Sequence, residues 1–293
     1  MQLSQLVYLL PLASLWAFAG LGEPITMILI ASTLFFAIKT QTLLMYRAKL
    51  KTKRADLAKI DFPSCLVWYS VWWGLKPSEF FSRRSLVSLN KNELLFVGAK
   101  ILLGLVLITL IVPRVHASEQ PLLAGWLGMV GIVFCMHFGC SHLSAVIMQS
   151  RGRNVTPIMN NPALAKTVSE FWGKRWNLAF RDYAHITLFM PLAKKWGAAI
   201  GALAGFAFSG VIHELAISVP ARGGYGWPML YFLIQGLAVL IERRMTKSGW
   251  LDSDSFGSRI WTIAIVALPA PLLFHQDFVL RVINPIVGWF ALC

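Results

Sequence analysis

The chain has 293 residues, of which 57% are hydrophobic and only 14% are charged, with a net charge of +14. Soluble domains are typically about 45–50% apolar and about 25% charged, so this many apolar residues cannot be buried in one water-surrounded core. Together with a mean hydropathy of +0.63, the composition excludes a disordered chain, a small disulfide-bonded scaffold and an ordinary soluble enzyme. It predicts a protein that crosses a membrane several times.

Long apolar stretches give the expected membrane spans in chain order. A helix needs roughly 17–25 mostly apolar residues to cross a bilayer, and lipid offers no hydrogen-bond partner to an exposed backbone, so we expect helices. The candidate stretches are 3–21, 24–44, 94–112, 122–147, 198–219, 227–241, 260–274 and 278–292. A further apolar patch at 186–192 is too short to cross and predicts an interfacial or re-entrant segment. We expect one all-α membrane domain over residues 1–293, with about eight spans.

Basic residues are distributed unevenly between the connections. Of the 27 Lys and Arg residues, 23 fall in 39–91, 151–195 and 243–259, which are alternate connections. Because cytoplasmic loops are enriched in Lys and Arg, this predicts cytoplasmic termini, and we expect a multi-pass protein of the cell inner membrane. The charge suits anionic lipid, and we expect no nucleic-acid partner. Residues 1–5 carry no Lys or Arg, unlike the start of a signal peptide, so we expect the first span to be retained.

Two further groups of residues have compositions that suggest a metal site or a membrane interface. Cys135 and His142 would share one helix face but lie roughly 10 Å apart along its axis, too far to bind one ion, so we expect no metal. Aromatic residues follow the basic run near residue 50 and predict a second interfacial element; they are Trp68, Trp72, Trp73, Phe80 and Phe81.

The connection between the fourth and fifth spans has an unusual composition. Winding residues 168–183 as one helix separates two faces. One carries Val168, Trp172, Trp176, Ala179 and Tyr183, and the other carries Glu170, Lys174, Asn177 and Arg181. Such a helix suits a membrane interface, and periodicity alone favours a plain anchor helix without chemistry.

Two ionisable residues, His213 and Glu214, lie side by side in the span 198–219. A charged side chain at membrane depth costs about 2.5 kcal/mol or more, so such residues usually face the bundle interior or a cavity. Ser209 lies one turn before His213 and is expected to hydrogen-bond the imidazole. The alternative is a buried His–Glu pair that serves packing. Histidine is the side chain best suited to proton transfer near neutral pH, which favours a functional role.

Together the two segments resemble the wax-synthase branch of the membrane-bound O-acyltransferases. That branch carries an F-W-G-x-R-W-N stretch, matched by residues 171–177, and an S-G-x-x-H-E stretch, matched by residues 209–214. Asn161-Pro162 also fits, and the resemblance is strongest over residues 150–245. It implies an MBOAT-like all-α membrane fold with interfacial or re-entrant helices. It also implies acyl transfer from acyl-CoA to a hydroxyl group, of a long-chain alcohol first and of a sterol-like or other lipid alcohol next.

The resemblance implies functional positions at His213 and Asn177. A hydroxyl is a weak nucleophile until a base takes its proton, so His213 is the expected general base. Asn177 would orient the acyl carbonyl or the acceptor hydroxyl, or help to hold the oxyanion. Without a G-x-S-x-G elbow, direct transfer is preferred over a covalent acyl-enzyme. Supporting roles are expected for Ser209, Glu214, Trp172 and Trp176.

Three cations near the first motif are expected to bind the phosphates of acyl-CoA, the co-substrate: Lys174, Arg175 and Arg181. Contact with anionic lipid headgroups is an equal alternative for each, and no other cofactor is expected. The competing function is a small transporter or lipid-translocating protein with His213 and Glu214 as a proton relay, although no repeat symmetry is found.

The sequence places the two expected catalytic residues at different depths in the bilayer. His213 lies roughly 20 Å along its helix from Ala198, whereas Asn177 belongs to a cytoplasmic connection. They can meet only if that connection dips into the bilayer, and the apolar patch at 186–192 favours such a dip.

Overall fold

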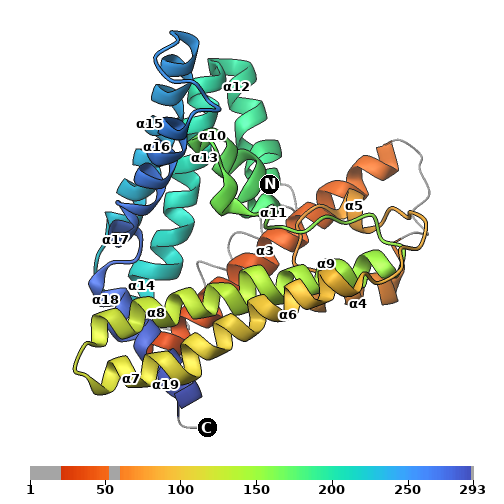
Figure 1. Ribbon diagram of the computed structural model, residues 1–293. Helices are drawn as coiled ribbons and strands as arrows, with labels where there is room; N and C mark the ends of the chain where they lie inside the picture. Colours follow the sequence, from red (N-terminus) through yellow and green to blue (C-terminus); the bar gives the residue numbers. More distant parts are fainter. Residues whose placement is uncertain (1–20, 53–59, 292–293) are drawn as a thin grey trace. The chain divides into compact units, whose positions relative to one another are not determined.

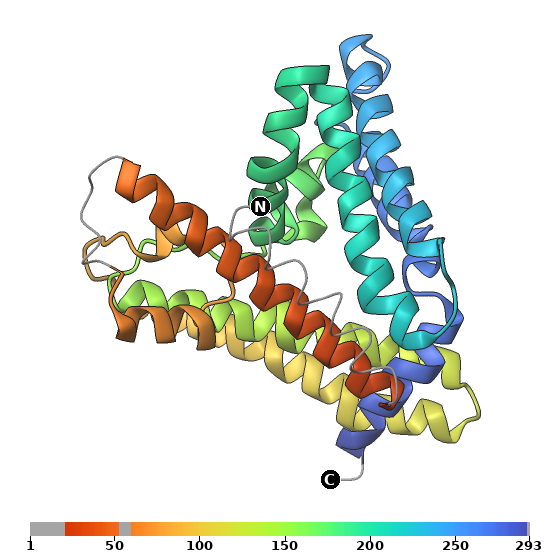
Figure 2. The ribbon, with the colours of Figure 1, turned by 180° about the vertical axis from the view of Figure 1, so that it is seen from behind.

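The computed structural model describes residues 21–52 and 60–291, and in these ranges all regular elements are helices. The predicted all-α class is therefore confirmed. The chain divides into two compact units, residues 1–158 with 286–293 and residues 159–285. Figures 1 and 2 show the chain from two opposite sides.

The first unit is built on three long helical stretches. They are α3 (Glu23–Thr52); α6 (Lys91–Val106) with η1 (Leu107–Ile111) and α7 (Val112–Ala117); and α8 (Pro121–Val133) with η2 (Phe134–Cys140) and α9 (Ser141–Ser150). The second and third stretches form an antiparallel hairpin, visible in both views (Figures 1 and 2). The short helices α4 (Phe62–Ser70) and α5 (Pro77–Phe80) complete this unit.

The aromatic residues expected at a second interface instead form a core of the first unit. Trp68 and Phe80 are fully buried and their ring centroids lie 5.3 Å apart, edge to face. Trp72 and Phe81 are also buried in this cluster. Lys39 of α3 donates hydrogen bonds there to the carbonyl oxygens of Trp72 and Gly74, at 2.5 and 3.0 Å. The interfacial prediction is wrong for these four aromatic residues, because an aromatic run packs equally well against protein or lipid.

The second unit carries both motifs. It begins with η3 (Pro162–Leu164), α10 (Val168–Glu170), η4 (Phe171–Arg175), α11 (Leu178–Ala184), η5 (His185–Phe189) and α12 (Met190–Trp196). It continues with α13 (Ala198–His213), η6 (Glu214–Ser218), α14 (Val219–Ala221), α15 (Trp227–Lys247), α16 (Phe256–Ala267), α17 (Ala270–Leu273), α18 (Gln276–Phe278) and η7 (Val279–Ile283). Helix α19 (Asn284–Ala291) follows and belongs mostly to the first unit. Helix α13 packs between α12 and α15, and α10 lies against α15 and α16.

Five helical stretches are long and apolar enough to cross a membrane: Glu23–Thr52, Lys91–His116, Pro121–Ser150, Ala198–Ala221 and Phe256–Leu273. They match five of the predicted spans. The expected span 3–21 lies outside the described residues. Residues 227–241 are helical within α15, but any eighteen-residue stretch of that helix contains Glu242, Arg243 and Arg244. Residues 278–291 are divided among short helical elements. The count of eight stays a prediction.

Candidate active site

The first motif does not lie on one continuous helix, so the prediction of a single two-faced helix over 168–183 is wrong. The helical path ends with the π-helical turn η4, and Trp176 adopts an extended conformation. Asn177 follows in the left-handed region, with φ 41° and ψ 59°, and α11 starts immediately after it. Asparagine tolerates this conformation better than most residues because its short side chain can hydrogen-bond locally. The break separates Asn177 from the face that it was expected to share with Lys174.

The apolar side of this segment packs against protein. Val168 is fully buried in a cluster with Ala238 and Val239 of α15, and Trp172 packs against the same cluster. Tyr183 is 3% exposed, and its ring lies 6.1 Å from that of Phe208 on α13. The expected anchor helix therefore has neighbouring helices, and not only lipid, as the partner of its apolar face.

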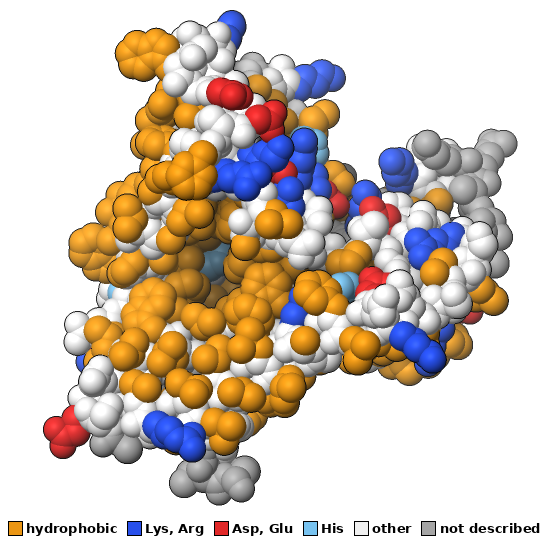
Figure 3. Space-filling model, in the orientation of Figure 1, with side chains coloured by type: hydrophobic (Ala, Val, Ile, Leu, Met, Phe, Trp, Pro, Cys, Tyr) orange, Lys and Arg blue, Asp and Glu red, His pale blue; other side chains and the backbone are white. Residues whose placement is uncertain are grey.

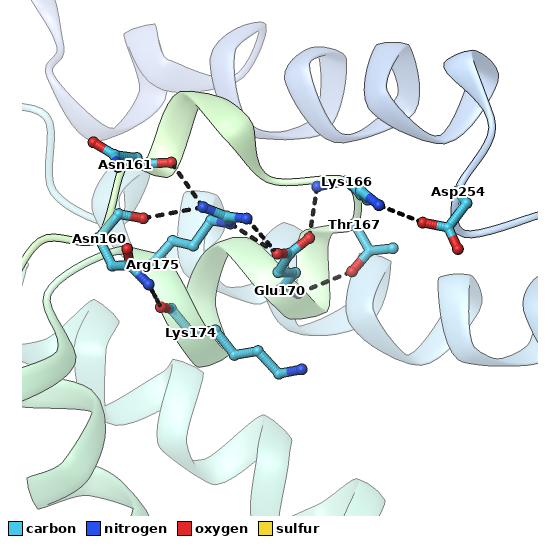
Figure 4. Close-up of polar contacts among 8 residues, drawn as sticks. All are labelled: Asn160, Asn161, Lys166, Thr167, Glu170, Lys174, Arg175 and Asp254. Atoms are coloured by element: carbon cyan, nitrogen blue, oxygen red, sulfur yellow. Dashed lines mark hydrogen bonds and ion pairs between the residues drawn. The ribbon is translucent and has the colours of Figure 1, made fainter.

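Arg175 is held within its own loop. Its guanidinium donates to Glu170 Oε1 from Nε at 2.8 Å and lies 2.7 Å from it through Nη2. Nη1 also donates to the carbonyl oxygens of Asn160 and Asn161, at 3.3 and 3.2 Å. Figure 4 shows these bonds converging on the one guanidinium. The donors predicted to bind CoA phosphates are thus already used to close the loop around residues 160–175.

The other two cations of the predicted phosphate site differ from Arg175. Arg181 forms an ion pair with Asp182 at 3.1 Å. Lys174 is exposed, and in Figure 4 its side chain points away from the Arg175 cluster. Within the described part of the chain its ammonium has no ion-pair or hydrogen-bond partner. Lys and Arg side chains also gather around the region of α10 on the molecular surface (Figure 3).

The loop lowers the pKa of two carboxyl groups that lie outside the spans. Burial acts to raise the pKa of Glu170, but hydrogen bonds from the Lys166 backbone and from Arg175 outweigh it and hold the pKa below its usual range. The hydrogen bond and the charge of Lys166 lower the pKa of Asp254, whose Oδ1 lies 2.5 Å from the ammonium. Both carboxyl groups are therefore ionised at neutral pH and pair with cations of the loop.

Asn177 uses part of its side chain as a helix cap. Its Oδ1 accepts a hydrogen bond from Phe180 N at 3.3 Å, which satisfies one of the free N–H groups at the start of α11. Its backbone N–H points to Met159 Sδ at 3.3 Å. The side-chain Nδ2 makes no hydrogen bond among the described residues. Capping fixes the amide plane and leaves its donor group for another partner.

His213 ends α13 and directly precedes the wide π-helical turn η6. Its Nδ1 lies 2.7 Å from the carbonyl oxygen of Ser209. A carbonyl oxygen can only accept, so Nδ1 carries the proton and the neutral ring holds its lone pair on Nε2. The residue is partly exposed, and its ring centroid lies 4.5 Å from that of Phe232 on α15. This arrangement presents Nε2 as the basic atom.

The two neighbours of His213 in the second motif have other partners than expected. The Ser209 hydroxyl donates to the carbonyl oxygen of Gly205 at 3.1 Å, so the bond to the imidazole comes from the Ser209 backbone and not from its side chain. Glu214 Oε1 accepts from the N–H groups of Gly226 and Met229, at 2.9 and 3.0 Å. These groups lie at the start of α15, so Glu214 acts there as a helix cap.

Asn177 and His213 lie at the outer ends of two helical arms that are joined at Gly197. The chain is helical from Leu178 to Trp196, turns at Gly197 with φ 89°, and returns along α13 to His213. At roughly 1.5 Å per residue the two arms measure about 28 and 24 Å. The stacked rings of Phe180 and Phe208, 5.8 Å apart, join the outer parts of the two arms. The patch 186–192 is thus part of a continuous helix between Asn177 and the turn at Gly197.

Aromatic rings connect the two motifs. The Trp172 ring lies 5.7 Å from that of Phe232, which in turn contacts the imidazole of His213. Within the first motif, the Trp176 ring stacks on that of Phe171, with centroids 5.6 Å apart. Asn177 and His213 share no hydrogen bond. Among residues 21–52 and 60–291, no group of three His, Cys, Asp or Glu side chains could hold a metal ion.

The comparisons with known proteins support the family resemblance predicted from the two motifs. Residues 155–234 match the model of the membrane bound O-acyl transferase family, and this range contains both motifs. The long-chain-alcohol O-fatty-acyltransferase of Simmondsia chinensis is 27% identical over 168 residues, which cover 52% of this chain and 48% of that protein.

Two proteins of Arabidopsis thaliana are similar over comparable lengths. The probable long-chain-alcohol O-fatty-acyltransferase 9 is 27% identical, covering 47% of this chain and 44% of that protein. The acyl-CoA--sterol O-acyltransferase 1 is 26% identical, covering 51% and 46%. The chain thus matches about half the length of these relatives. The wax-synthase branch is the part of the family that it resembles.

Sequence reasoning missed two polar residues of α15 that contact the first motif or the residues just before it. Glu242 Oε2 and Oε1 accept from the N–H groups of Val168 and Ser169, at 2.6 and 3.0 Å. Gln235 Oε1 accepts from Trp172 Nε1 at 3.1 Å. A glutamine inside the predicted span 227–241 was the signal that could have drawn notice, since polar groups at membrane depth need partners.

Proposed function

We propose that this protein is a membrane O-acyltransferase that moves a fatty acyl group from acyl-CoA to the hydroxyl group of a long-chain alcohol, giving a wax ester. The observation that carries the proposal is the state of His213: the Ser209 carbonyl oxygen, 2.7 Å from Nδ1, fixes the tautomer with a basic Nε2. The relatives named as long-chain-alcohol O-fatty-acyltransferases favour this acceptor. A sterol is the second candidate acceptor, on the name of one relative.

The proposed reaction needs one base and no covalent intermediate. His213 Nε2 takes the proton of the acceptor hydroxyl while that oxygen attacks the thioester carbonyl carbon. The tetrahedral intermediate collapses with loss of the C–S bond, and the imidazolium returns the proton to the departing CoA sulfur. Asn177 would donate from Nδ2 to the acyl carbonyl oxygen, on which negative charge develops. Atoms and charge balance, and acyl-CoA serves as co-substrate without a further cofactor.

The surroundings of the two residues support these roles. Asn177 and His213 lie at the same end of the helical pair, and Lys174 is an exposed cation three residues before Asn177. We assign Lys174 to the CoA phosphates and Arg175 to loop closure. Together with the predicted cytoplasmic termini and inner-membrane location, this gives CoA access from the basic side.

The test is acyl transfer by the purified protein in lipid nanodiscs, with a long-chain acyl-CoA and a long-chain alcohol or a sterol as acceptor. Thiol release and ester formation are measured for wild type, H213A and N177A. A general base contributes about 10²–10⁴-fold, so H213A should lose at least 100-fold in kcat. His185 lies in the same unit, is exposed and stacks on Phe189, so H185Q is the matched control and should be unchanged.

Two results would contradict the proposal. One is full activity of H213A. The other is lipid translocation or solute uptake that depends on His213 without any thiol release, which would favour the competing transporter with His213 and Glu214 as a proton relay.

A further inference from the structure

We infer that Gln235 and Glu242 of α15 are positioning residues that hold the segment 168–177 in register with His213. The inference rests on the proposed function, because Asn177 and His213 are the residues whose placement it explains. Both positioning residues lie outside the range 155–234 that matches the family. They are therefore a feature of this fold that the motifs do not contain.

Glu242 anchors the start of the segment. Its side chain is 2% exposed, and its two oxygens accept from consecutive backbone N–H groups, those of Val168 at 2.6 Å and Ser169 at 3.0 Å. The first N–H groups of a helix have no partner within the helix, and a carboxylate there also suits the helix dipole. The next N–H, that of Glu170, is taken by Thr167 Oγ1 at 2.9 Å. The start of α10 is thus bound to α15 by a buried carboxylate.

Gln235 anchors the middle of the segment. It is fully buried, and its Oε1 accepts from Trp172 Nε1 at 3.1 Å. Its Nε2 donates to the carbonyl oxygen of Ile265 on α16 at 2.8 Å, which fixes the orientation of the amide. A buried amide needs both of these partners, because an unsatisfied polar group in the interior costs about 1–3 kcal/mol if either is removed.

The same face of α15 also contacts the second motif. Residues three or four apart lie on one side of a helix, so Phe232, Gln235, Val239 and Glu242 form one row. Phe232 stands at one end of the row against His213, with ring centroids 4.5 Å apart, and Glu242 at the other end holds Val168. One rigid helix therefore contacts both motifs and sets the separation between them.

This arrangement predicts a distinct kinetic signature. Removing an anchor lets the segment and Asn177 shift while leaving His213 and the exposed Lys174 chemically unchanged. Because a displacement of about 1 Å in a reacting group costs about 100-fold in rate, kcat should fall far more than the affinity for acyl-CoA.

The test compares E242Q, E242A and Q235M with R243Q as the control, since Arg243 is exposed and adjacent on the same helix. We expect kcat to fall about 10-fold in E242Q, which keeps one acceptor oxygen, and about 100-fold in E242A, with KM for acyl-CoA changed by less than about twofold. Q235M should resemble E242Q. Hydrogen exchange at residues 166–173 should accelerate in all three and stay unchanged in R243Q.

The conservative variants keep the test informative where E242A does not fold. If H213A is inactive but folded E242Q and Q235M keep the wild-type kcat, the positioning inference is overturned and the proposed function stands. If H213A is fully active, the proposed function fails, and the anchoring is judged by hydrogen exchange alone: unchanged exchange at residues 166–173 in E242Q and Q235M overturns it.

Discussion

Arg175 and Lys174 are adjacent cations in the first motif to which we assign different roles. The perturbation is the neutral substitution of each, R175Q and K174Q. We expect R175Q to destabilise the loop 160–175 and lower kcat through Asn177, and K174Q to weaken acyl-CoA binding without loss of stability.

The magnitude for R175Q follows from the contacts of the guanidinium. Its side chain is 18% exposed and that of Glu170 is 20% exposed, so this ion pair is shielded from water on most sides. Exposed pairs contribute about 0.2–1 kcal/mol, and breaking a buried pair costs about 3–5 kcal/mol. Two backbone carbonyl groups also lose their donor. We therefore expect a loss of about 2 kcal/mol, which corresponds to a fall in Tm on the order of 5 °C.

K174Q is expected to change only the binding of acyl-CoA and not the stability of the fold. No ion pair or hydrogen bond of its ammonium is lost within the described ranges, and surface substitutions usually change stability by less than about 0.5 kcal/mol. A charge-assisted bond to phosphate contributes about 1.5–3 kcal/mol, so KM for acyl-CoA should rise about tenfold or more.

Thermal unfolding in detergent and thiol release over a range of acyl-CoA concentrations separate the two variants. Lys247 is also exposed, and K247Q serves as a charge-matched control. A Tm for R175Q equal to that of wild type, combined with a KM raised as in K174Q, would refute the reasoning and return Arg175 to the phosphate site.

Three further predictions follow. The pKa of Glu170 is lowered in the folded protein, so its stabilising contribution is present above the ordinary value of 4.5 and is lost as pH falls through the lower folded value. The difference in Tm between wild type and E170Q should therefore shrink below about pH 4, and a constant difference would contradict the shift. E214A removes the acceptor of Gly226 N and Met229 N, so stability should fall by about 1 kcal/mol. Its kcat in the thiol assay should change less than threefold; a loss of activity equal to that of H213A at unchanged Tm would show that Glu214 takes part in the reaction and is more than a helix cap. A Cβ at Gly210 would lie 3.0 Å from Met229 Cα, so G210V should lower the stability by about 2 kcal/mol and accelerate trypsin cleavage. A variant as stable as wild type would show that α13 and α15 can separate to accommodate the side chain.

The helix interruption at Trp176-Asn177 shows where sequence periodicity stopped being informative. A period of 3.6 residues predicted one helix over 168–183, and each residue of that pattern is compatible with a helix. Contacts with distant parts of the second unit hold the residues that precede the break. Glu242 and Gln235 fix the segment on α15, and Arg175 binds the carbonyl oxygens of the preceding loop. None of these partners is within one helical turn, so no local pattern records them.

The composition, the long apolar runs and the two motifs determined the all-α membrane class, five of the span positions and the choice of His213 and Asn177, because hydropathy and motif spacing are properties of the linear chain. Only the tertiary structure decided which side chains are already engaged. In the structure Arg175 forms an ion pair with Glu170, Glu214 caps the start of α15, and the His213 imidazole bonds to the Ser209 carbonyl oxygen. Hydrogen bonds between distant segments depend on how helices pack, and packing brings together residues whose separation along the chain carries no signal.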